Sequence, residues 1–196
     1  MIEHASGVAS VILAGVGGQG TILTSKILTQ GLLAAGYDVK MSEVHGMSQR
    51  GGSVSTQVRY GRRVDSPIIG VGGADILVAF EKLEAARYAK YLKPGGIAIV
   101  NMHEILPVPV SSGLDTYPQG IVEALELSFR VTRIDAADIA ARAGNSRTMN
   151  IVLLGAMVKA LGMEHMDWQA ALRGQVPPKA LAENLAAFAA GMEALA

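Results

Sequence analysis

The first part of the chain passes from a short apolar run to a segment with helical periodicity and back. Residues 8–14 are almost wholly apolar and end in glycines, which is typical of a strand buried on both faces. In residues 19–35 apolar positions return every three or four residues, and Gly36 follows where a helix would end. Residues 38–42 again have a strand pattern. This order predicts a Rossmann-like βαβ unit with a right-handed parallel crossover.

The remainder of the chain continues to alternate between strand and helix patterns. Residues 53–60 alternate between a largely apolar and a polar set of side chains, which predicts a strand with one wet or partner-facing side. Further strands are predicted at 76–80, 97–100 and 129–134, and helices at 81–92, 136–143 and 148–161. The proline-rich stretch 102–119 favours neither a helix nor a central strand. The pattern predicts an α/β fold, a three-layer α/β/α domain with a mainly parallel sheet.

The last part of the chain is helical in pattern, with predicted helices at 167–173 and 179–195. The second has an apolar stripe at three- and four-residue steps, made of Leu181, Leu185, Phe188 and Met192. We expect the stripe to pack on its own domain, and docking on another subunit is the alternative. A length of 196 residues is that of one domain. We therefore predict a single domain over residues 1–196, with a helical C-terminal extension at about 164–196.

Composition and charge exclude several classes of function. The 17 Lys and Arg residues balance 17 Asp and Glu residues, so the chain lacks the excess of basic residues that binds nucleic acid. It has no cysteine, which excludes disulfides, thiolate zinc sites and cysteine-ligated iron–sulfur clusters. No apolar run approaches the ~20 residues that a bilayer requires, and the first ten residues do not resemble a targeting sequence. We expect a cytoplasmic protein without a membrane partner.

The chain is also rich in apolar residues for a protein with these properties. Half of its residues are hydrophobic and only 17% are charged, below the roughly 25% that is usual. Such a balance is inconsistent with a disordered chain, and it indicates that part of the apolar surface contacts a partner.

A glycine-rich loop separates the first predicted strand from the first predicted helix. It reads Gly15-Val16-Gly17-Gly18-Gln19-Gly20. Glycines at this place let the chain turn tightly and let backbone N–H groups approach an anion at the positive end of the helix. A nucleotide-binding P-loop would require lysine at the next position, where Thr21 stands. The loop therefore does not predict an NTPase.

The same glycines fit the G-x-G-x-x-G spacing of dinucleotide-binding folds. That interpretation also requires an acidic residue at the end of the second strand, and Asp38 and Glu43 bracket the place loosely. Three interpretations stay open on the loop alone. The loop binds NAD(P), or it faces a phosphate or cofactor presented by a different chain, or its glycines only allow close packing of helix on strand.

The segment that follows the second predicted strand concentrates polar side chains. Arg50 is flanked by Gly51 and Gly52, so its guanidinium can reach a carboxylate or phosphate in fork geometry. An ion pair between Arg50 and Glu43 is the alternative. His45 can relay a proton or bond to a substrate carbonyl, or it can be a structural hydrogen-bonding residue.

The two polar segments follow strands, and ligands of open α/β sheets bind at the carboxyl ends of strands. We therefore predict that residues 15–21 and 43–53 form one crevice that closes over an active site. Asn150 lies among apolar neighbours of a predicted helix. It can bond across to the glycine loop or the crevice, or be a satisfied core amide.

Together, GVGGQG at 15–20 and SEVHGMSQRGGSVSTQVRYG at 42–61 resemble the gamma-type subunit of 2-oxoacid:ferredoxin oxidoreductases, closest to the beta subunit of the indolepyruvate type. The resemblance spans nearly the whole chain and is weakest between residues 101 and 130. It returns at 66–68, 73–77, 80–85, 91–96, 150–155 and 176–184.

The resemblance implies a function that this chain performs only with a partner. In such enzymes a 2-oxoacid is decarboxylated on thiamine diphosphate, its acyl group passes to coenzyme A as co-substrate, and electrons pass through iron–sulfur clusters to ferredoxin. Thiamine diphosphate, magnesium and the clusters are expected in a larger partner subunit, and none of these cofactors in this chain alone. The isolated chain is expected to be inactive, and it can form a homodimer.

The resemblance and the residues together give a set of expected site residues. His45 and Arg50 are expected to be catalytic by completing the site of the partner. No metal ligand is predicted. The expected cofactor-binding residues are Gly15, Gly17, Gly18, Gln19, Gly20, Thr21, Glu43, Gly51, Gly52 and Asn150. Two alternatives from other classes are a Rossmann-type NAD(P)-binding oxidoreductase and a non-catalytic assembly module whose glycines are purely structural.

Overall fold

The computed structural model describes residues 7–45 and 51–195. Within these residues one sheet has six strands in the order β2-β3-β1-β4-β5-β6. Their bounds are β1 (Val8–Val16), β2 (Asp38–His45), β3 (Ser53–Gly61), β4 (Ala74–Ala79), β5 (Leu92–Asn101) and β6 (Arg130–Ile134). Strands β1, β4, β5 and β6 pair in parallel, whereas β3 is antiparallel to both of its neighbours. The predicted α/β fold with a mainly parallel sheet is confirmed.

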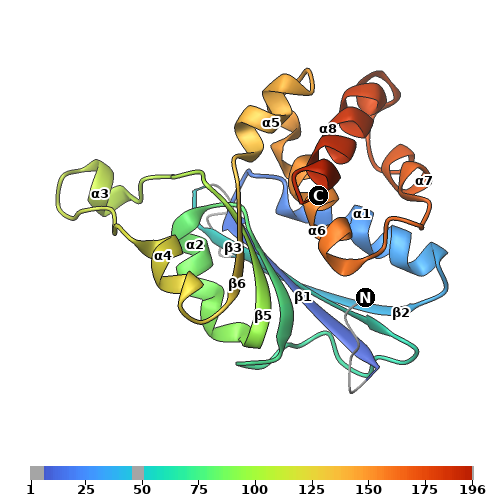
Figure 1. Cartoon of the computed structure of the whole chain (residues 1–196), viewed down its shortest axis with the longest axis horizontal. Helices are drawn as coiled ribbons and strands as arrows, with labels where there is room; N and C mark the ends of the chain where they lie inside the picture. Colours follow the sequence, from blue (N-terminus) through green and yellow to red (C-terminus); the bar gives the residue numbers. More distant parts are fainter. Residues whose placement is uncertain (1–6, 46–50, 196) are drawn as a thin grey trace.

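Helices cover both faces of the sheet, which gives the three predicted layers (Figure 1). Helices α1, α5, α6, α7 and α8 lie on one face, and α2 and α4 lie on the other. The helix bounds are α1 (Thr21–Ala34), α2 (Lys82–Tyr88), α3 (Val108–Ser111), α4 (Ile121–Glu126), α5 (Ala136–Arg142), α6 (Met149–Leu161), α7 (Trp168–Arg173) and α8 (Leu181–Glu193).

Strand β1 is buried on both faces because its side chains alternate between two hydrophobic cores. Val11 and Leu13 pack into the core under α1 and α6, whereas Ile12 and Ala14 pack into the core under α2 and α4. All four are at most 1% exposed. The unbroken apolar run that predicted this strand therefore reflects burial from both sides.

The first βαβ unit differs from the prediction in one respect. Strand β2 runs in the same direction as β1 but does not pair with it, because β3 lies between them and is antiparallel to both. The predicted parallel crossover is therefore present, although it joins two strands that are not neighbours. The residue pattern of β2 would allow it to pair with β1 or with β3. It pairs with β3, because β3 occupies the position next to β1.

The expected wet side of β3 is also largely covered. Ser55 is only 4% exposed, and Gln57 accepts a hydrogen bond of 2.6 Å from the backbone N–H of Ile69. The guanidinium of Arg59 donates to Ser10 Oγ and to the carbonyl of Ser66. The apolar set faces the α1 side, as the alternation predicts, with Val58 fully buried.

Several element boundaries differ from the sequence pattern. Helix α2 ends at Tyr88, and a 3-10 turn over Ala89–Tyr91 leads into β5, which begins at Leu92 and includes Pro94. The single-turn helix α3 and the short helix α4 are not predicted. Both are shorter than two turns, so neither produces a readable apolar period.

The C-terminal helix α8 packs on α6 within this chain, at very short range. A Cβ atom on Gly155 of α6 would lie 2.1 Å from the carbonyl oxygen of Phe188, and one on Gly191 of α8 would lie 2.0 Å from that of Val152. The helix backbones therefore touch. The predicted stripe packs on its own domain: Phe188 is buried, and Leu181, Leu185 and Met192 are partly buried against the same core. Ala187 and Gly191 are buried as well, so the contact face of α8 is wider than the stripe.

We predict that Gly155→Ala and Gly191→Ala each lower the free energy of unfolding by roughly 1–3 kcal/mol, because a methyl group overpacks the backbone contact. Denaturant unfolding followed by circular dichroism measures the change. Gly70→Ala is the control, because a Cβ atom there meets nothing within 4 Å and the residue has no positive φ. Unchanged unfolding midpoints for both helix variants would contradict the close contact.

Candidate functional site

The glycine loop and the segment before β3 are in direct backbone contact. The N–H of Gly17 donates to the carbonyl of Gly52 at 2.9 Å, and the N–H of Gly51 donates to the carbonyl of Gly17 at 3.4 Å. These bonds extend the antiparallel pairing of β1 and β3, in which Val16 is opposite Ser53. The two predicted segments are thus adjacent, although the strands that lead into them, β1 and β2, are not neighbours.

Gln19 uses its side chain to brace the glycine loop. Its Oε1 accepts a hydrogen bond of 2.7 Å from the N–H of Val16, and its Nε2 donates one of 2.9 Å to the carbonyl of Phe80 at the end of β4. A Cβ atom on Gly15 would lie 2.9 Å from both Gln19 Oε1 and Phe80 Cβ. Gly15 is therefore needed for this close approach, and the Gln19 amide is occupied within the loop.

The amino end of α1 is open to an anion. Gly20 stands before the helix with a φ of +84°, no side chain caps the helix, and its first turn has no acidic residue. The N–H groups at such an end lack intrahelical partners and favour negative charge. Thr21, predicted to bind a cofactor, is only 4% exposed, so its hydroxyl is largely covered.

Asn150 of α6 lies against the glycine loop. A Cβ atom on Gly20 would lie 2.8 Å from Asn150 Nδ2. The Thr24 hydroxyl donates to the carbonyls of both Gly20 and Asn150, at 3.1 and 3.3 Å. These contacts fix α6 against the start of α1.

The Asn150 side chain faces a cleft of about 450 Å³. The residue is 7% exposed, and its amide makes no hydrogen bond to any residue that the structure describes. Arg147 and Lys179 also line the cleft, each exposed. The Asn150 amide therefore reaches the surface of the cleft, which Glu183 also lines, and it can bind a polar group there.

The other expected site residues are placed less closely. Glu43 is half-buried on β2, opposite Thr56, and β3 separates it from the glycine loop. His45 is the last residue of β2. Arg50 lies outside the described residues, and with it the alternative ion pair to Glu43.

The position of β3 also argues against the dinucleotide interpretation. The fingerprint requires an acidic residue at the carboxyl end of the strand beside β1, where it can hold a ribose. Here that neighbour is the antiparallel β3, so Glu43 lies one strand too far away. Asp38 is at the opposite end of β2, where it accepts a 2.7 Å hydrogen bond from the N–H of Val64.

A second polar cluster, which the sequence analysis missed, lies beside the glycine loop. The Ser53 hydroxyl donates to Glu84 Oε2 at 2.5 Å, and Arg87 donates to Glu84 Oε1 at 3.1 Å. Glu81, only 1% exposed, accepts from the N–H of Glu84 and from the Tyr117 hydroxyl. The available signal was a pair of glutamates three residues apart, directly after the buried strand β4.

Burial shifts the acidity of groups in this cluster. It raises the pKa of Glu84 above its ordinary value, while the hydrogen bond from Ser53 and the charge of Arg87 act in the opposite direction. Burial likewise raises the pKa of Tyr117, and the hydrogen bond to Glu81 adds to this effect. Glu84 thus holds the first residue of β3 with a carboxyl group whose charge is disfavoured.

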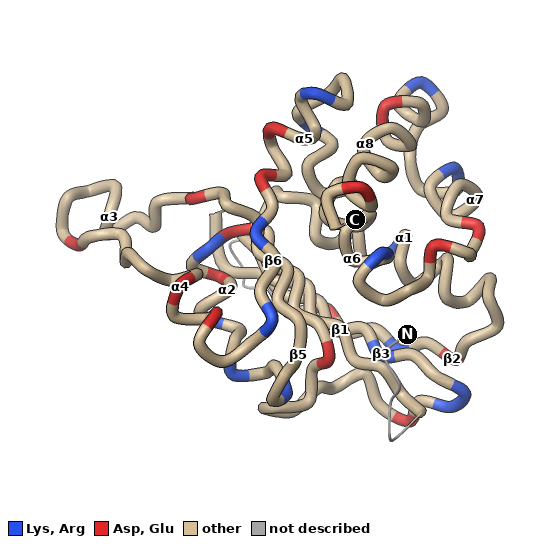
Figure 2. Tube along the Cα trace, viewed as in Figure 1, with Lys and Arg blue, Asp and Glu red and all other residues tan. Residues whose placement is uncertain are grey.

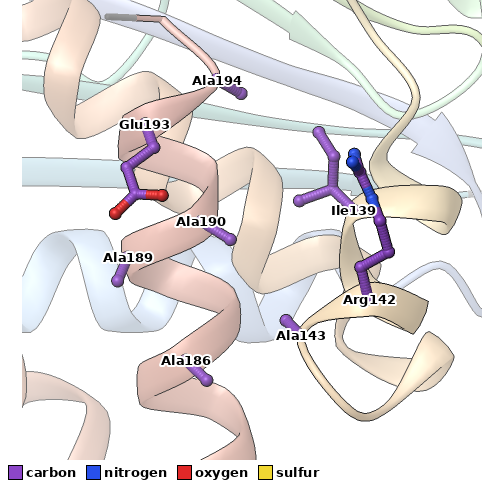
Figure 3. A pocket seen from close by; sticks show the side chains of 8 residues that line it. All are labelled: Ile139, Arg142, Ala143, Ala186, Ala189, Ala190, Glu193 and Ala194. Carbon is purple, nitrogen blue, oxygen red and sulfur yellow. The ribbon is translucent and has the colours of Figure 1, made fainter.

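The groove between α5 and α8 is unrelated to this site. It has a volume of about 460 Å³ and is lined mainly by alanines, with Arg142 and Glu193 (Figure 3). Arg142 forms an ion pair of 3.1 Å with Asp138. The groove brings no set of polar groups together, so it is not a candidate active site.

The described residues include neither a metal-binding cluster nor a membrane-spanning helix. No group of three or more His, Cys, Asp or Glu residues in the described ranges is arranged to hold a metal ion. None of the helices described combines the length and the apolar character needed to cross a bilayer.

Comparison with known proteins identifies the family. Residues 10–194 match the family described as pyruvate ferredoxin/flavodoxin oxidoreductase. The chain is 42% identical over 194 residues to an indolepyruvate oxidoreductase subunit of Pyrococcus horikoshii, covering 94% of this chain and 95% of that one. The chain therefore belongs to the pyruvate ferredoxin/flavodoxin oxidoreductase family.

Solved structures agree with this assignment. The gamma subunit of a keto/oxoacid ferredoxin oxidoreductase from Geobacter sulfurreducens matches with a TM-score of 0.70 and 26% identity, over 95% of this chain and 98% of that chain. A 2-oxoglutarate:ferredoxin oxidoreductase from Magnetococcus marinus has the same fold, with a TM-score of 0.73 and 21% identity, over 96% of this chain but 31% of that chain. The predicted resemblance to gamma-type oxidoreductase subunits is confirmed, and an independent NAD(P)-dependent enzyme is not favoured.

We predict that Glu84→Gln flattens the dependence of stability on pH. Since the folded state raises the pKa of Glu84, its contribution is most favourable at low pH. It is lost as pH rises from the ordinary value of 4.5 through the raised folded value. Urea unfolding between about pH 4 and pH 8 measures the free energy of unfolding of both proteins. The stability of the variant relative to wild type should increase as pH rises.

Glu126→Gln is the control for this experiment. Glu126 is exposed and its pKa is lowered, first by a hydrogen bond from Arg133, so its contribution is instead lost as pH falls. Parallel pH curves for wild type and Glu84→Gln would contradict the assigned burial of Glu84.

Proposed function

We propose that the chain is the small subunit of a cytoplasmic, thiamine diphosphate-dependent 2-oxoacid:ferredoxin oxidoreductase that acts on indolepyruvate or a related aryl pyruvate. One observation carries the proposal. The glycine loop and the residues before β3 are bonded together at one edge of the sheet, in a chain that is 42% identical to an indolepyruvate oxidoreductase subunit. This edge completes the active site of a larger subunit.

The proposed overall reaction converts a 2-oxoacid, coenzyme A and oxidised ferredoxin into an acyl-coenzyme A, carbon dioxide and reduced ferredoxin. Thiamine diphosphate supplies the decarboxylation chemistry, and iron–sulfur clusters carry the electrons released. The residues of this chain do not fit a cluster, because it has no cysteine. We therefore assign thiamine diphosphate, magnesium and the clusters to the larger subunit, and no reaction step on them to this chain.

The contribution of this chain is to bind and orient. Backbone N–H groups of Gly18 and Gly20, with the open end of α1, are suited to anionic groups such as the phosphates of coenzyme A. The unpartnered amide of Asn150 lies beside them. The Magnetococcus marinus enzyme of the same fold was solved with 2-oxoglutarate, coenzyme A and succinyl-coenzyme A bound.

His45 and Arg50 complete this proposed site. Arg50 precedes Gly51, which is bonded to Gly17, so the chain enters the glycine loop region directly after Arg50. A guanidinium there can pair with a substrate carboxylate or a phosphate. His45 ends β2 at the same edge of the sheet and can exchange a proton with a bound substrate.

We predict that Arg50→Ala lowers the turnover of the assembled enzyme by at least about tenfold, because it removes a charge-assisted contact to an anion. The assay is ferredoxin reduction by the reconstituted complex with indolepyruvate and coenzyme A. Arg62→Ala, exposed and outside this edge, is the control. Wild-type turnover for Arg50→Ala, with an unchanged unfolding midpoint, would remove Arg50 from the site.

We also predict that the purified chain alone neither binds nicotinamide dinucleotides at micromolar concentration nor oxidises an oxoacid. Isothermal titration with NADH and NADPH tests the first statement, and an assay without the larger subunit tests the second. Micromolar binding or enzymatic turnover by the isolated chain would overturn the proposal. Full activity of a complex whose loop glycines have been substituted without unfolding would instead favour a non-catalytic assembly module.

A further inference from the structure

A projecting arm, formed by residues 105–116, extends from the body of the molecule and contains α3 (Figure 1). Its apolar side chains are unusually exposed: Leu106 by 52%, Val108 by 79% and Leu114 by 85%. Of the nine large hydrophobic residues that are exposed in the described part of the chain, three lie on this arm. Such a concentration marks a surface that another protein covers.

The arm is folded on itself. The N–H groups of Leu114 and Asp115 both donate to the carbonyl of Pro109, at 2.8 and 3.1 Å. The N–H of Ser112 donates to the carbonyl of Val108 at 3.0 Å. Because these bonds and the prolines restrict the backbone, the arm presents its apolar side chains at a low entropic cost of binding.

Both ends of the arm are fixed to one buried carboxylate. Glu81 Oε1 accepts hydrogen bonds from the N–H of Ile105, at 3.3 Å, and from the hydroxyl of Tyr117. The ammonium group of Lys82 pairs with Glu104 beside them. The direction of the arm is therefore set by the start of α2.

The base of the arm belongs to the same edge of the sheet as the candidate site. Glu81 follows Phe80, whose carbonyl accepts the Gln19 side chain of the glycine loop. A protein that covers the candidate site is therefore close to the base of the arm.

The charge of the arm indicates the chemistry of its partner. Asp115 is the only charged residue between positions 105 and 116, and the tube around α3 is almost entirely uncharged (Figure 2). A nucleic acid or a strongly charged protein surface would require complementary charge, which the arm does not offer. A neutral, apolar groove is the matching surface.

We propose that this arm docks into an apolar groove on the larger, thiamine-containing subunit and holds the two subunits together next to the active site. The inference rests on the proposed function. In the Magnetococcus marinus enzyme the same fold is 31% of a longer chain, so there the remainder of that chain is covalently attached to it. In the proposed complex the arm supplies a non-covalent attachment.

A second copy of this chain is a less suitable occupant. The groove it offers lies between α5 and α8, on a different part of the molecule from the arm (Figure 1). A second copy bound there would not make use of the position of the arm next to the candidate site.

The test measures the Kd between the larger subunit and each of two double variants of this chain. The larger subunit is obtained by co-expression and purification with this chain. Val108→Ser with Leu114→Ser should raise the Kd of subunit association by about tenfold or more, since two apolar side chains lose their burial. Leu33→Ser with Val71→Ser is the matched control, because these residues are 54% and 73% exposed and lie away from the arm. Its Kd should equal that of wild type.

Two further measurements make the outcome decisive. Circular dichroism and unfolding of each isolated variant check that the chain is folded. A photocrosslinking amino acid in place of Leu114, in an otherwise wild-type chain, should attach to the larger subunit. An unchanged Kd for the arm variant, equal losses in both double variants, or crosslinking only to a second copy would overturn the proposal. If wild-type subunits assemble but oxidise no oxoacid, the proposed function fails, whereas the docking role of the arm is still judged by the Kd.

Discussion

The antiparallel pairing of β3 with β1 is the constraint on which the candidate site depends. It puts Ser53 opposite Val16, so the residues just before β3 must meet the glycine loop that follows β1. The bonds between Gly17 and the pair Gly51 and Gly52 are a direct consequence of that register. In a fold with only parallel neighbours, the loop after β1 would meet the loop after β2. Here β3 runs back between β2 and β1, so the polar residues just before β3 reach the glycine loop.

The acidic residues next to the site support its geometry. Glu84 holds Ser53, at the start of β3, and Glu81 caps α2 and fixes residues 105 and 117. Gln19 donates a hydrogen bond to the carbonyl of Phe80, the residue directly after β4. Hydrogen bonds made by side chains thus connect three loops at one edge of the sheet. Since buried polar groups are costly when unpaired, these bonds favour one arrangement of the loops over others.

The sequence predicted most of the fold, because its elements are long and their apolar patterns are unambiguous. The buried run of β1, the period of α1 and the helices α6 and α8 all appear within a few residues of the predicted bounds. Strand order was not predictable in the same way. The alternation of β3 specifies which face is apolar, but it does not say that β3 lies between β1 and β2. The contact of Gly155 with α8 depends on a partner helix some thirty residues away.

The candidate site was predicted only in part, for a related reason. Local spacing identified the glycine loop, and Asn150 does lie against Gly20. The roles of Glu81, Glu84 and Tyr117 depend on contacts between segments far apart in sequence, so no local pattern shows them.

The attachment of both arm ends to Glu81 has a consequence for divergence within the family. Adding residues to a closed loop raises the entropic cost of closing it only slightly. The arm can therefore be lengthened, shortened or reshaped while the sheet stays unchanged. Related chains are thereby free to present a different surface at this point without altering the sheet beside it.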